Sequence, residues 1–268
     1  MEIEKLSETD ILNSTFLERE VTVDFYFTGE RIEEVNDMLL INDGQDLITM
    51  NFEQILKKLN DEKAVKPLLC VGIHCGPDRK NEYGTAGILN YKEQGSKAKL
   101  YTCFILEELL PFISNKFSLS KSVQKSFCGF SLGGLSAFDI AWNHANEFSK
   151  IGVFSGSFWW RTVSQDAPEF VEEEHRIMHQ QVRNGNYNPS LKFFFEAGEL
   201  DETADRNHNG IIDSIDDTIS LIDELIKKGY SVENDIFYLQ LKDGKHDVST
   251  WGRAFPVFLK WGWQKKRV

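Results

Sequence analysis

The stretch Cys128-Gly129-Phe130-Ser131-Leu132-Gly133-Gly134 contains the pattern Gly-x-Ser-x-Gly between two segments of different periodicity. A short run typical of a buried strand, 126–128, precedes the pattern, and residues 135–142 follow it with the spacing of a helix. A strand, a sharp turn and a helix form the context of a nucleophile elbow, in which glycines flank the serine because side chains would clash there. The pattern therefore predicts Ser131 as a nucleophile, with the backbone amide of Leu132 directed at the same space. The alternative is a glycine-rich turn with a capping serine.

The composition is that of an acidic globular chain. Of its 268 residues, 41% are hydrophobic and 27% are charged, and the formal net charge is −12. We therefore expect one domain over residues 1–268, without a nucleic-acid partner or an attraction to anionic membranes. No apolar run approaches the roughly 20 residues of a membrane span, and residues 1–16 lack an apolar signal core, so we expect a cytoplasmic protein unless a signal segment has been removed. None of the four cysteines forms a Cys-x-x-Cys pair, which favours free thiols.

Strand-like and helical segments alternate from Met38 to the C-terminus. This alternation predicts an α/β fold with a mostly parallel sheet covered by helices on both faces. Residues 162–190 form a polar insertion that we expect to cap the site. The predicted strands are 21–27, 38–41, 67–73, 126–128, 150–154, 191–197 and 236–241. The main predicted helices are 52–59, 100–117, 218–228 and 251–263.

Three candidate catalytic side chains each follow a predicted strand. Ser131, the loop at Asp201 and His246 would meet at one edge, because the reactive site of such sheets forms at the carboxyl ends of strands. The order Ser, Asp or Glu, His is that of the α/β-hydrolases. His246 is the predicted base, since an imidazole titrates near neutrality. The pair His175 and His179 lacks the glutamate of a zinc-protease helix, which argues against metal binding there.

Several ordered motifs, from about residue 21 to 263, carry a family resemblance. They are Leu40-Ile41-Asn42-Asp43-Gly44-Gln45-Asp46, the loop with Arg79 and Glu82-Tyr83, Glu107-Glu108-Leu109-Leu110-Pro111-Phe112, Gly129 to Gly134, Ser155-Gly156-Ser157-Phe158-Trp159-Trp160 and Gly244-Lys245-His246-Asp247. Together they resemble the putative-esterase family of α/β-hydrolases, which includes enterochelin (siderophore) esterases, feruloyl and acetylxylan esterases, S-formylglutathione hydrolases and mycolyltransferases. The Ser155 to Trp160 stretch most resembles the enterochelin-esterase branch.

The resemblance implies the remaining catalytic parts. The family's acid falls after a strand and a glycine turn, which points to Asp201, with Glu202 as the alternative and Glu199 third. Acyl transfer needs two amides at the oxyanion, and losing one donor costs roughly 3 kcal/mol. Besides Leu132, the resemblance points to the amide of Gln45. An ordinary strand-to-helix turn is the alternative for Gln45.

Aromatic and basic residues near the same sheet edge are candidates for substrate contacts. Aromatic side chains after residue 154 would form a wall for a bulky acyl group, although they are equally typical of a core. Arginines would supply positive charge for an anionic catecholate. The predicted substrate-binding residues are Arg79, Phe158, Trp159, Trp160, Arg161 and Arg253.

Residues 205–216 match the ligand spacing of a calcium loop. An aspartate stands at the twelfth position, where glutamate is usual, and a loop rather than a helix leads in. An asparagine- and glycine-rich turn before a helix is the alternative. Any ion would be structural, because a serine triad needs no metal or other cofactor. The predicted ligands are Asp205, Asn207, Asn209, Ile211, Asp213 and Asp216.

These observations predict a serine esterase that hydrolyses a carboxylic ester through an acyl-enzyme. The substrate would be a small-molecule or glycan-linked ester. A siderophore ester is the first candidate, and a carbohydrate esterase that removes acetyl or feruloyl groups is the alternative. Transfer of the acyl group to an alcohol is a third possibility. A calcium-stabilised binding module with a relict triad is the alternative outside enzymes.

Overall fold

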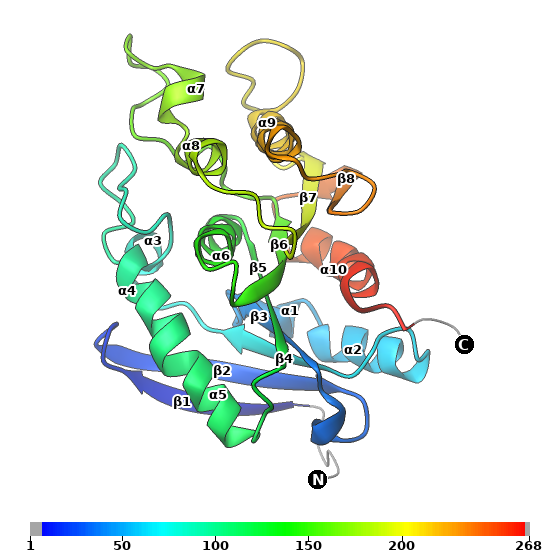
Figure 1. Ribbon diagram of the computed structural model, residues 1–268. Helices are drawn as coiled ribbons and strands as arrows, with labels where there is room; N and C mark the ends of the chain where they lie inside the picture. The colour runs from blue at the N-terminus through cyan, green and yellow to red at the C-terminus, as the bar shows by residue number, and fades with distance from the viewer. Residues whose placement is uncertain (1–6, 266–268) are drawn as a thin grey trace.

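The computed structural model describes residues 7–265, in which an eight-stranded sheet is covered by helices on both faces (Figure 1). The strand order is β1-β2-β4-β3-β5-β6-β7-β8. The strands β1 and β2 run antiparallel to their neighbours, and the pairs from β4 to β8 are parallel. This is the arrangement of the α/β-hydrolases, which confirms the predicted fold class.

The strands are β1 (Ser7–Ser14), β2 (Arg19–Thr28), β3 (Asp37–Asn42), β4 (Leu68–Ile73), β5 (Gln124–Phe130), β6 (Phe148–Phe154), β7 (Lys192–Leu200) and β8 (Ile236–Lys245). The helices before the elbow are η1 (Ile32–Glu34), α1 (Asp46–Thr49), α2 (Phe52–Asp61), α3 (Arg79–Glu82), α4 (Ala98–Cys103), the π-helical η2 (Phe104–Leu109) and α5 (Leu110–Lys116). Those after it are α6 (Leu132–Asn143), α7 (Glu172–His175), α8 (Ile177–Asn184), α9 (Asp213–Lys228) and α10 (Val248–Trp263).

Two apolar cores lie on opposite faces of the sheet. Side chains of α1, α2 and α10, among them Phe52 and Phe255, pack in one core. Side chains of α4, α6, α8 and α9, among them Phe138 and Leu221, pack in the other. The strands between them are apolar on both sides, because both of their faces are buried. This double covering fixes the sheet whose carboxyl edge carries the candidate site.

Several elements differ from the sequence prediction. The strand β1 was not predicted because its sequence is polar, yet it pairs along its length with β2 at the edge of the sheet. The predicted helix 100–117 contains the π-helical turn η2, which ends before Pro111. The helix α9 begins at Asp213, five residues earlier than predicted, and its first turn therefore includes the end of the calcium-like loop.

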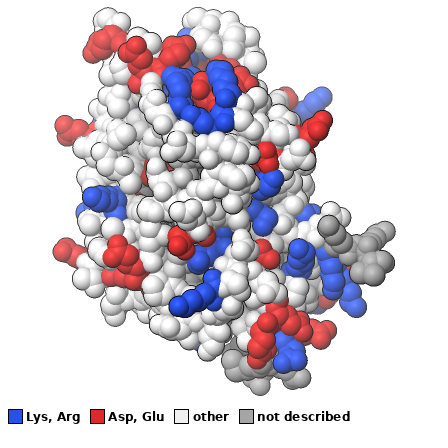
Figure 2. Space-filling view, in the orientation of Figure 1, with Lys and Arg blue, Asp and Glu red and all other residues white. Residues whose placement is uncertain are grey.

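No helix within residues 7–265 is long and apolar enough to cross a bilayer. On the face shown in Figure 2, acidic and basic side chains lie interspersed among uncharged residues.

Candidate active site

Ser131 occupies the turn between β5 and α6, as the sequence predicted. Its backbone angles are φ 54° and ψ −122°, a region that residues other than glycine rarely adopt. The turn is tight: a Cβ added to Gly129 would lie 2.4 Å from the carbonyl oxygen of Gly133. A hydrogen bond to the neighbouring strand stabilises this strained conformation: the Ser131 amide donates to the carbonyl of Phe154 on β6 at 2.8 Å. These are the features of a nucleophile elbow.

The three predicted catalytic residues line one small cavity at the carboxyl ends of β5, β6, β7 and β8. Its volume is about 280 Å³. The cavity is lined by Ser131, Ser155, Gly156, Ser157, Trp159, Asp201, Glu202, Ser214 and His246. The fold therefore brings a serine, an acid and a histidine together from separate parts of the chain.

Asp201 and His246 interact electrostatically. Partial burial lowers the pKa of His246, and the negative charge of Asp201 opposes that shift. Burial raises the pKa of Asp201, whereas Ser155, the Gly198 amide and His246 oppose it. The His246 ring packs edge-on against Trp251, with 5.3 Å between ring centroids. An imidazole positioned in this way, with a carboxylate beside it, can take up and return a proton.

The hydroxyl of Ser131 interacts with Ser157 in this structure, at 3.4 Å between the two Oγ atoms. Hydrogen bonds between nucleophile and base are often long in a free enzyme and tighten once substrate binds. The Ser131 hydroxyl faces the same cavity as His246, so this geometry is compatible with proton transfer between them.

The neighbouring acids have other partners. Glu202 lies at the cavity but accepts a hydrogen bond from the Ser214 amide at 2.6 Å, at the start of α9. Glu199 accepts from the side chain of Gln240 at 2.9 Å. Asp247 caps α10 by accepting from the Thr250 amide at 2.8 Å. These contacts favour Asp201 over Glu202 and Glu199 as the acid.

The loop after β3 carries Gln45 and is held by an ion pair that the sequence did not predict. The guanidinium of Arg79 binds both carboxylate oxygens of Asp43 at 2.7 Å. Asp43 itself has φ 60° and is almost fully buried. Arg79 also donates to the carbonyl of Phe130 at 3.4 Å, directly before the nucleophile. Arg79 therefore links the predicted oxyanion loop to the elbow.

The side chain of Gln45 fixes its own backbone. Its Oε1 accepts from the amide of Cys75 at 3.1 Å, and its Nε2 lies 3.3 Å from the Cys75 sulfur. Gln45 stands immediately before α1, and Leu132 is the first residue of α6. Amides at helix starts have no partner within the helix and are free to bind an oxyanion. The assignment of these two amides stays a prediction.

We expect Arg79→Ala to lower kcat for ester hydrolysis by about 10²-fold, the size of effect seen when one oxyanion donor is lost. The loss would arise because Asp43 no longer holds its left-handed backbone. Steady-state kinetics with p-nitrophenyl acetate measure the effect, and Arg253→Ala is the matched control with no expected change. Equal activity of Arg79→Ala and wild type would show that the ion pair does not position the loop.

The predicted aromatic wall is only partly correct. Phe158 and Trp160 are 0% and 1% exposed, so they belong to the core and cannot contact a substrate. Phe158 packs against Phe138 and Phe195. Trp159, by contrast, lines the cavity. Adjacent residues of this turn point in different directions, which the letters alone do not reveal.

The three arginines have different surroundings. Arg79 is paired with Asp43, as described above, and Arg253 pairs with Asp243 at 2.7 Å on the surface. None of the three arginines lines the catalytic cavity. Arg161 is 7% exposed, and its positive charge helps to lower the pKa of Glu172. Its guanidinium lies 5.9 Å from the ring centroid of Trp159. Arg79 and Arg253 each already pair with a carboxylate and lie outside the cavity lining, and their contact with a substrate stays a prediction.

Residues 14–261 match the model of a family described as putative esterase. The chain belongs to the putative esterase family. It is also 25% identical over 130 residues to the uncharacterized protein YbbA of Bacillus subtilis (strain 168), which covers 47% of this chain. The chain thus spans about half, 51%, of the length of that curated relative.

Solved structures of esterases share the fold. The enterobactin esterase FES from Shigella flexneri, in the presence of enterobactin, aligns with a TM-score of 0.73 and 21% identity over 96% of this chain and 58% of its own. A ferulic acid esterase aligns with a TM-score of 0.68 and 15% identity over 95% and 96%. The siderophore hydrolase EstB from Aspergillus nidulans aligns with a TM-score of 0.67 and 16% identity over 96% and 98%. At these identities the likeness shows the fold alone.

The chain has a loop at residues 205–216 in which four of the six predicted calcium ligands converge. Asp216 accepts hydrogen bonds from the side chains of Asn207 and Asn209 at 2.6 and 3.1 Å. Asp205 accepts from the amides of Asn209 and Gly210 at 3.1 and 2.9 Å. Within residues 7–265, no three His, Cys, Asp or Glu side chains are grouped to hold a metal ion.

The other two predicted ligands of this loop are placed differently. Asp213 turns away, since its carboxylate accepts from the Arg206 amide at 2.9 Å and also pairs with the Arg206 guanidinium. The prediction that the Asp213 side chain belongs to the calcium-ligand set is therefore wrong in this structure. The amide of Ile211 donates to Asn209 Oδ1 at 2.8 Å. The role of the Ile211 carbonyl stays a prediction.

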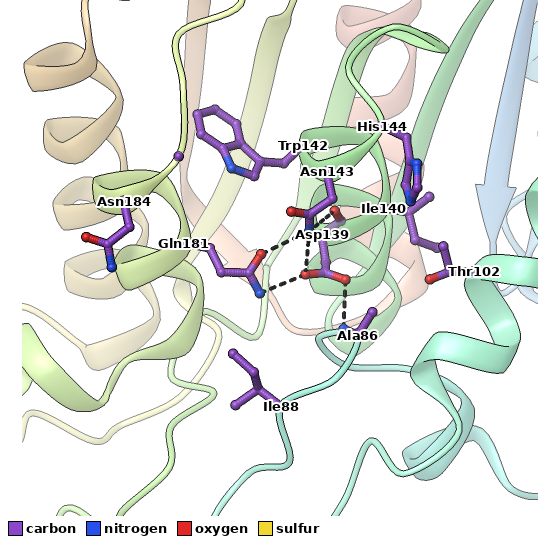
Figure 3. Close-up of a pocket in the computed structure, with 11 residues that line it drawn as sticks. Ala86, Ile88, Thr102, Asp139, Ile140, Trp142, Asn143, His144, Gln181 and Asn184 are labelled. Carbon is purple, nitrogen blue, oxygen red and sulfur yellow. Dashed lines mark hydrogen bonds between the residues drawn. The ribbon is translucent and has the colours of Figure 1, made fainter.

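A second cleft lies beside the carboxyl end of α6, with a volume of about 370 Å³ (Figure 3). The buried carboxylate of Asp139 accepts from the Ala86 amide, Gln181 and Asn143 at 2.9, 2.9 and 3.1 Å. The Asp139 carboxylate thereby connects α6, the helix that follows Ser131, to the 84–88 loop and to α8. Burial raises the pKa of Asp139 to about 6.

Asp139 is expected to make stability depend on pH. Because its folded pKa of about 6 lies above the unfolded value, the folded state binds more protons between these values, and stability falls as pH rises through this window. The contribution lost between pH 4.5 and 7 is about 2 kcal/mol. Urea unfolding of wild type and Asp139→Asn at both pH values measures it. A difference in unfolding free energy that does not change with pH would contradict the shift.

Two polar residues of the cavity were not predicted as site residues, although Ser155 belongs to one of the motifs that carry the resemblance. Ser155 accepts a hydrogen bond from Trp251 Nε1 at 2.9 Å and connects β6 with α10. Ser214 is 9% exposed, and its hydroxyl has no partner within the described chain. Ser214 lies within the calcium-like stretch 205–216 but is not at one of its ligand positions, so the motif did not indicate a place at the catalytic cavity.

Proposed function

We propose that this protein is a serine carboxylic-ester hydrolase with Ser131 as nucleophile, His246 as base and Asp201 as the acid that orients it. The single observation that carries the proposal is the cavity that Ser131, Asp201 and His246 line together. Membership of the putative esterase family supports the same reaction class.

The reaction proceeds through two acyl transfers. His246 removes the Ser131 proton as Oγ attacks the ester carbonyl, and the oxyanion is stabilised by the amides of Leu132 and Gln45. The imidazolium then gives this proton to the leaving alcohol, which leaves an acyl-enzyme. His246 next deprotonates a water molecule that attacks the acyl carbon, and the proton returns to Ser131 as the acid departs. Every step uses side chains and amides of this chain, with no cofactor.

A siderophore-type ester is the first candidate substrate. Trp159 supports it, because its ring lines the cavity and lies 5.9 Å from the buried guanidinium of Arg161, which does not itself line the cavity. Similar folds occur in an enterobactin esterase and in a siderophore hydrolase. The ring of an aromatic acid would stack on Trp159 in the cavity.

A carbohydrate ester is the second candidate. The cavity presents four serine hydroxyls and two carboxylates but no lysine or arginine among its lining residues. Hydroxyl groups of a sugar can donate to these oxygens, while Trp159 offers a face for stacking. A neutral, hydroxyl-rich alcohol suits this lining better than an anion does.

A substrate panel separates the candidates. Hydrolysis of enterobactin, methyl ferulate, acetylated xylan and p-nitrophenyl acetate would be compared at equal enzyme concentration, with Ser131→Ala as the blank. Preference for enterobactin supports the siderophore role, and preference for ferulate or acetylated xylan supports the carbohydrate role. Product formation on an added alcohol would identify acyl transfer. Hydrolysis of none of the four by the wild type would favour the binding module.

We also propose that residues 162–190 cap the site. Arg176, between α7 and α8, pairs with the buried Asp217 of α9 at 2.9 Å. Arg206 of the acidic loop binds the same carboxylate and also pairs with Glu172. These ion pairs connect the insertion to the segment that follows Asp201. A movement of the insertion would therefore change the position of Asp201, the proposed catalytic acid.

Calcium binding to the 205–216 loop is a further part of the proposal. Asp205, Asn207, Asn209 and Asp216 supply oxygen donors of the kind that calcium prefers. With calcium at a hundredfold excess over its dissociation constant, we expect about 2.7 kcal/mol of added stability. Differential scanning calorimetry with calcium or EDTA measures it, and Asp205→Asn with Asp216→Asn should abolish the shift. An unchanged melting temperature in calcium would refute a calcium site.

A further inference from the structure

Glu196 is a buried acid that the proposed reaction does not use. It lies within β7 and is 1% exposed, and neither of its carboxylate oxygens has a hydrogen-bond partner within residues 7–265. Its backbone is fixed, since its carbonyl accepts from the Ser155 amide at 2.8 Å. An isolated carboxylate in such a place is costly, so a proton or a specific role is needed to explain it.

The side chain of Glu196 projects from the strand face on which the catalytic acid rests. Residues two apart in a strand share a face, so Glu196 and Gly198 point to the same side. A Cβ added to Gly198 would lie 2.7 Å from Asp201 Oδ1, which therefore fills the space left by the missing side chain. This Oδ1 is also buried without a hydrogen-bond partner in the described chain. Both oxygens of Glu196 and the Oδ1 of Asp201 thus lack a donor on one face of β7, while Asp201 Oδ2 accepts from the Gly198 amide at 3.2 Å.

A single proton shared by the two carboxyl groups would supply the missing donor. The protonated carboxyl group donates a hydrogen bond, and the ionised carboxylate accepts it. The charged and titratable groups around Glu196 are Asp201, Arg253 from α10 and Tyr238 from β8. Burial, followed by the charge of Asp201, raises the pKa of Glu196 to about 8, while Arg253 and the Ser155 amide oppose the shift. Glu196 is therefore the member of the pair that is neutral at pH 7.

We propose that Glu196 is a positioning residue, whose carboxyl proton supplies the hydrogen bond that Asp201 Oδ1 lacks and so holds Asp201 toward His246. The inference rests on the proposed function, since it assigns Asp201 as the catalytic acid. The value of kcat would then depend on Glu196, a buried acid that acts through Asp201 rather than by direct contact with substrate or His246.

Two variants test the proposal. Glu196→Gln keeps a neutral donor of similar shape, so its kcat at pH 7 should stay within about threefold of wild type. Glu196→Leu removes the donor, and misplacement of Asp201 should lower kcat by about 10- to 100-fold. Its melting temperature should rise, because an apolar side chain replaces a buried carboxyl group.

The pH profile of kcat distinguishes a positioning role of Glu196 from a purely structural role, because a structural role would not change this profile. Wild-type kcat should fall above about pH 8, where Glu196 loses its proton, and Glu196→Gln should stay level there. Rates with p-nitrophenyl acetate are corrected with Ser131→Ala. A Glu196→Leu variant with wild-type kcat, or a Glu196→Gln variant that still loses activity above pH 8, overturns the proposal.

Controls separate this inference from the proposed function. If Ser131→Ala and Asp201→Asn are inactive while Glu196→Leu hydrolyses like wild type, the inference alone fails. If Ser131→Ala remains active, the proposed function fails and the inference fails with it. Should Glu196→Leu not fold, the profile of Glu196→Gln decides the matter.

Discussion

Replacing Ser131 with alanine is expected to lower kcat for p-nitrophenyl acetate hydrolysis by about 10⁵- to 10⁶-fold, because no acyl-enzyme can form without its Oγ. The fold should be unaffected, since Ser131 Oγ contacts only Ser157 Oγ among the hydrogen bonds within residues 7–265. Burst-phase and steady-state kinetics measure the loss, and circular dichroism checks the fold.

Ser157→Ala is the matched control for that experiment. Its hydroxyl lies 3.4 Å from the nucleophile and lines the same cavity, yet the reaction assigns it no proton or bond. We expect a change of less than about tenfold, the size of one ordinary hydrogen bond. Comparable losses for both serines would mean that the elbow serine has no special role.

Replacing Asp201 with asparagine is expected to lower kcat by about 10⁴-fold, because the amide favours the wrong tautomer of His246 and cannot stabilise its charged form. Glu202→Gln tests the alternative acid. Its carboxylate caps α9 through the Ser214 amide, so we expect kcat within about threefold of wild type and a small loss of stability.

The pH dependence of the same two variants provides a second check. The acid limb of kcat/KM should report His246, whose pKa is lowered by partial burial and raised by Asp201. In Asp201→Asn the opposing charge is absent, so this limb should shift to lower pH.

A larger loss of kcat in Glu202→Gln than in Asp201→Asn would assign the acid to Glu202 instead.

The sequence predicted the elements whose signal is local. The elbow at Ser131 is such a case, because glycines, strand and helix stand next to one another in the chain. The order of Ser131, Asp201 and His246 along alternating strands also predicted that they meet at one sheet edge, and the cavity contains all three.

Features that depend on contacts between distant segments were not predictable. Arg79 and Asp43 are 36 residues apart, and nothing in either segment shows that they form an ion pair. Phe158 and Trp160 look the same in sequence as Trp159, yet they turn into the core while Trp159 faces the cavity. Strand β1 is polar, and only its pairing with β2 identifies it as a strand.

Covalent labelling of Ser131 tests the central claim most directly. The wild-type protein would be treated with a fluorophosphonate, digested and analysed by mass spectrometry. We predict one phosphonate on the peptide that contains Ser131, abolished in Ser131→Ala and strongly slowed in His246→Ala. No adduct in the wild type, or an adduct on another serine that persists in Ser131→Ala, would contradict a serine esterase built around this elbow.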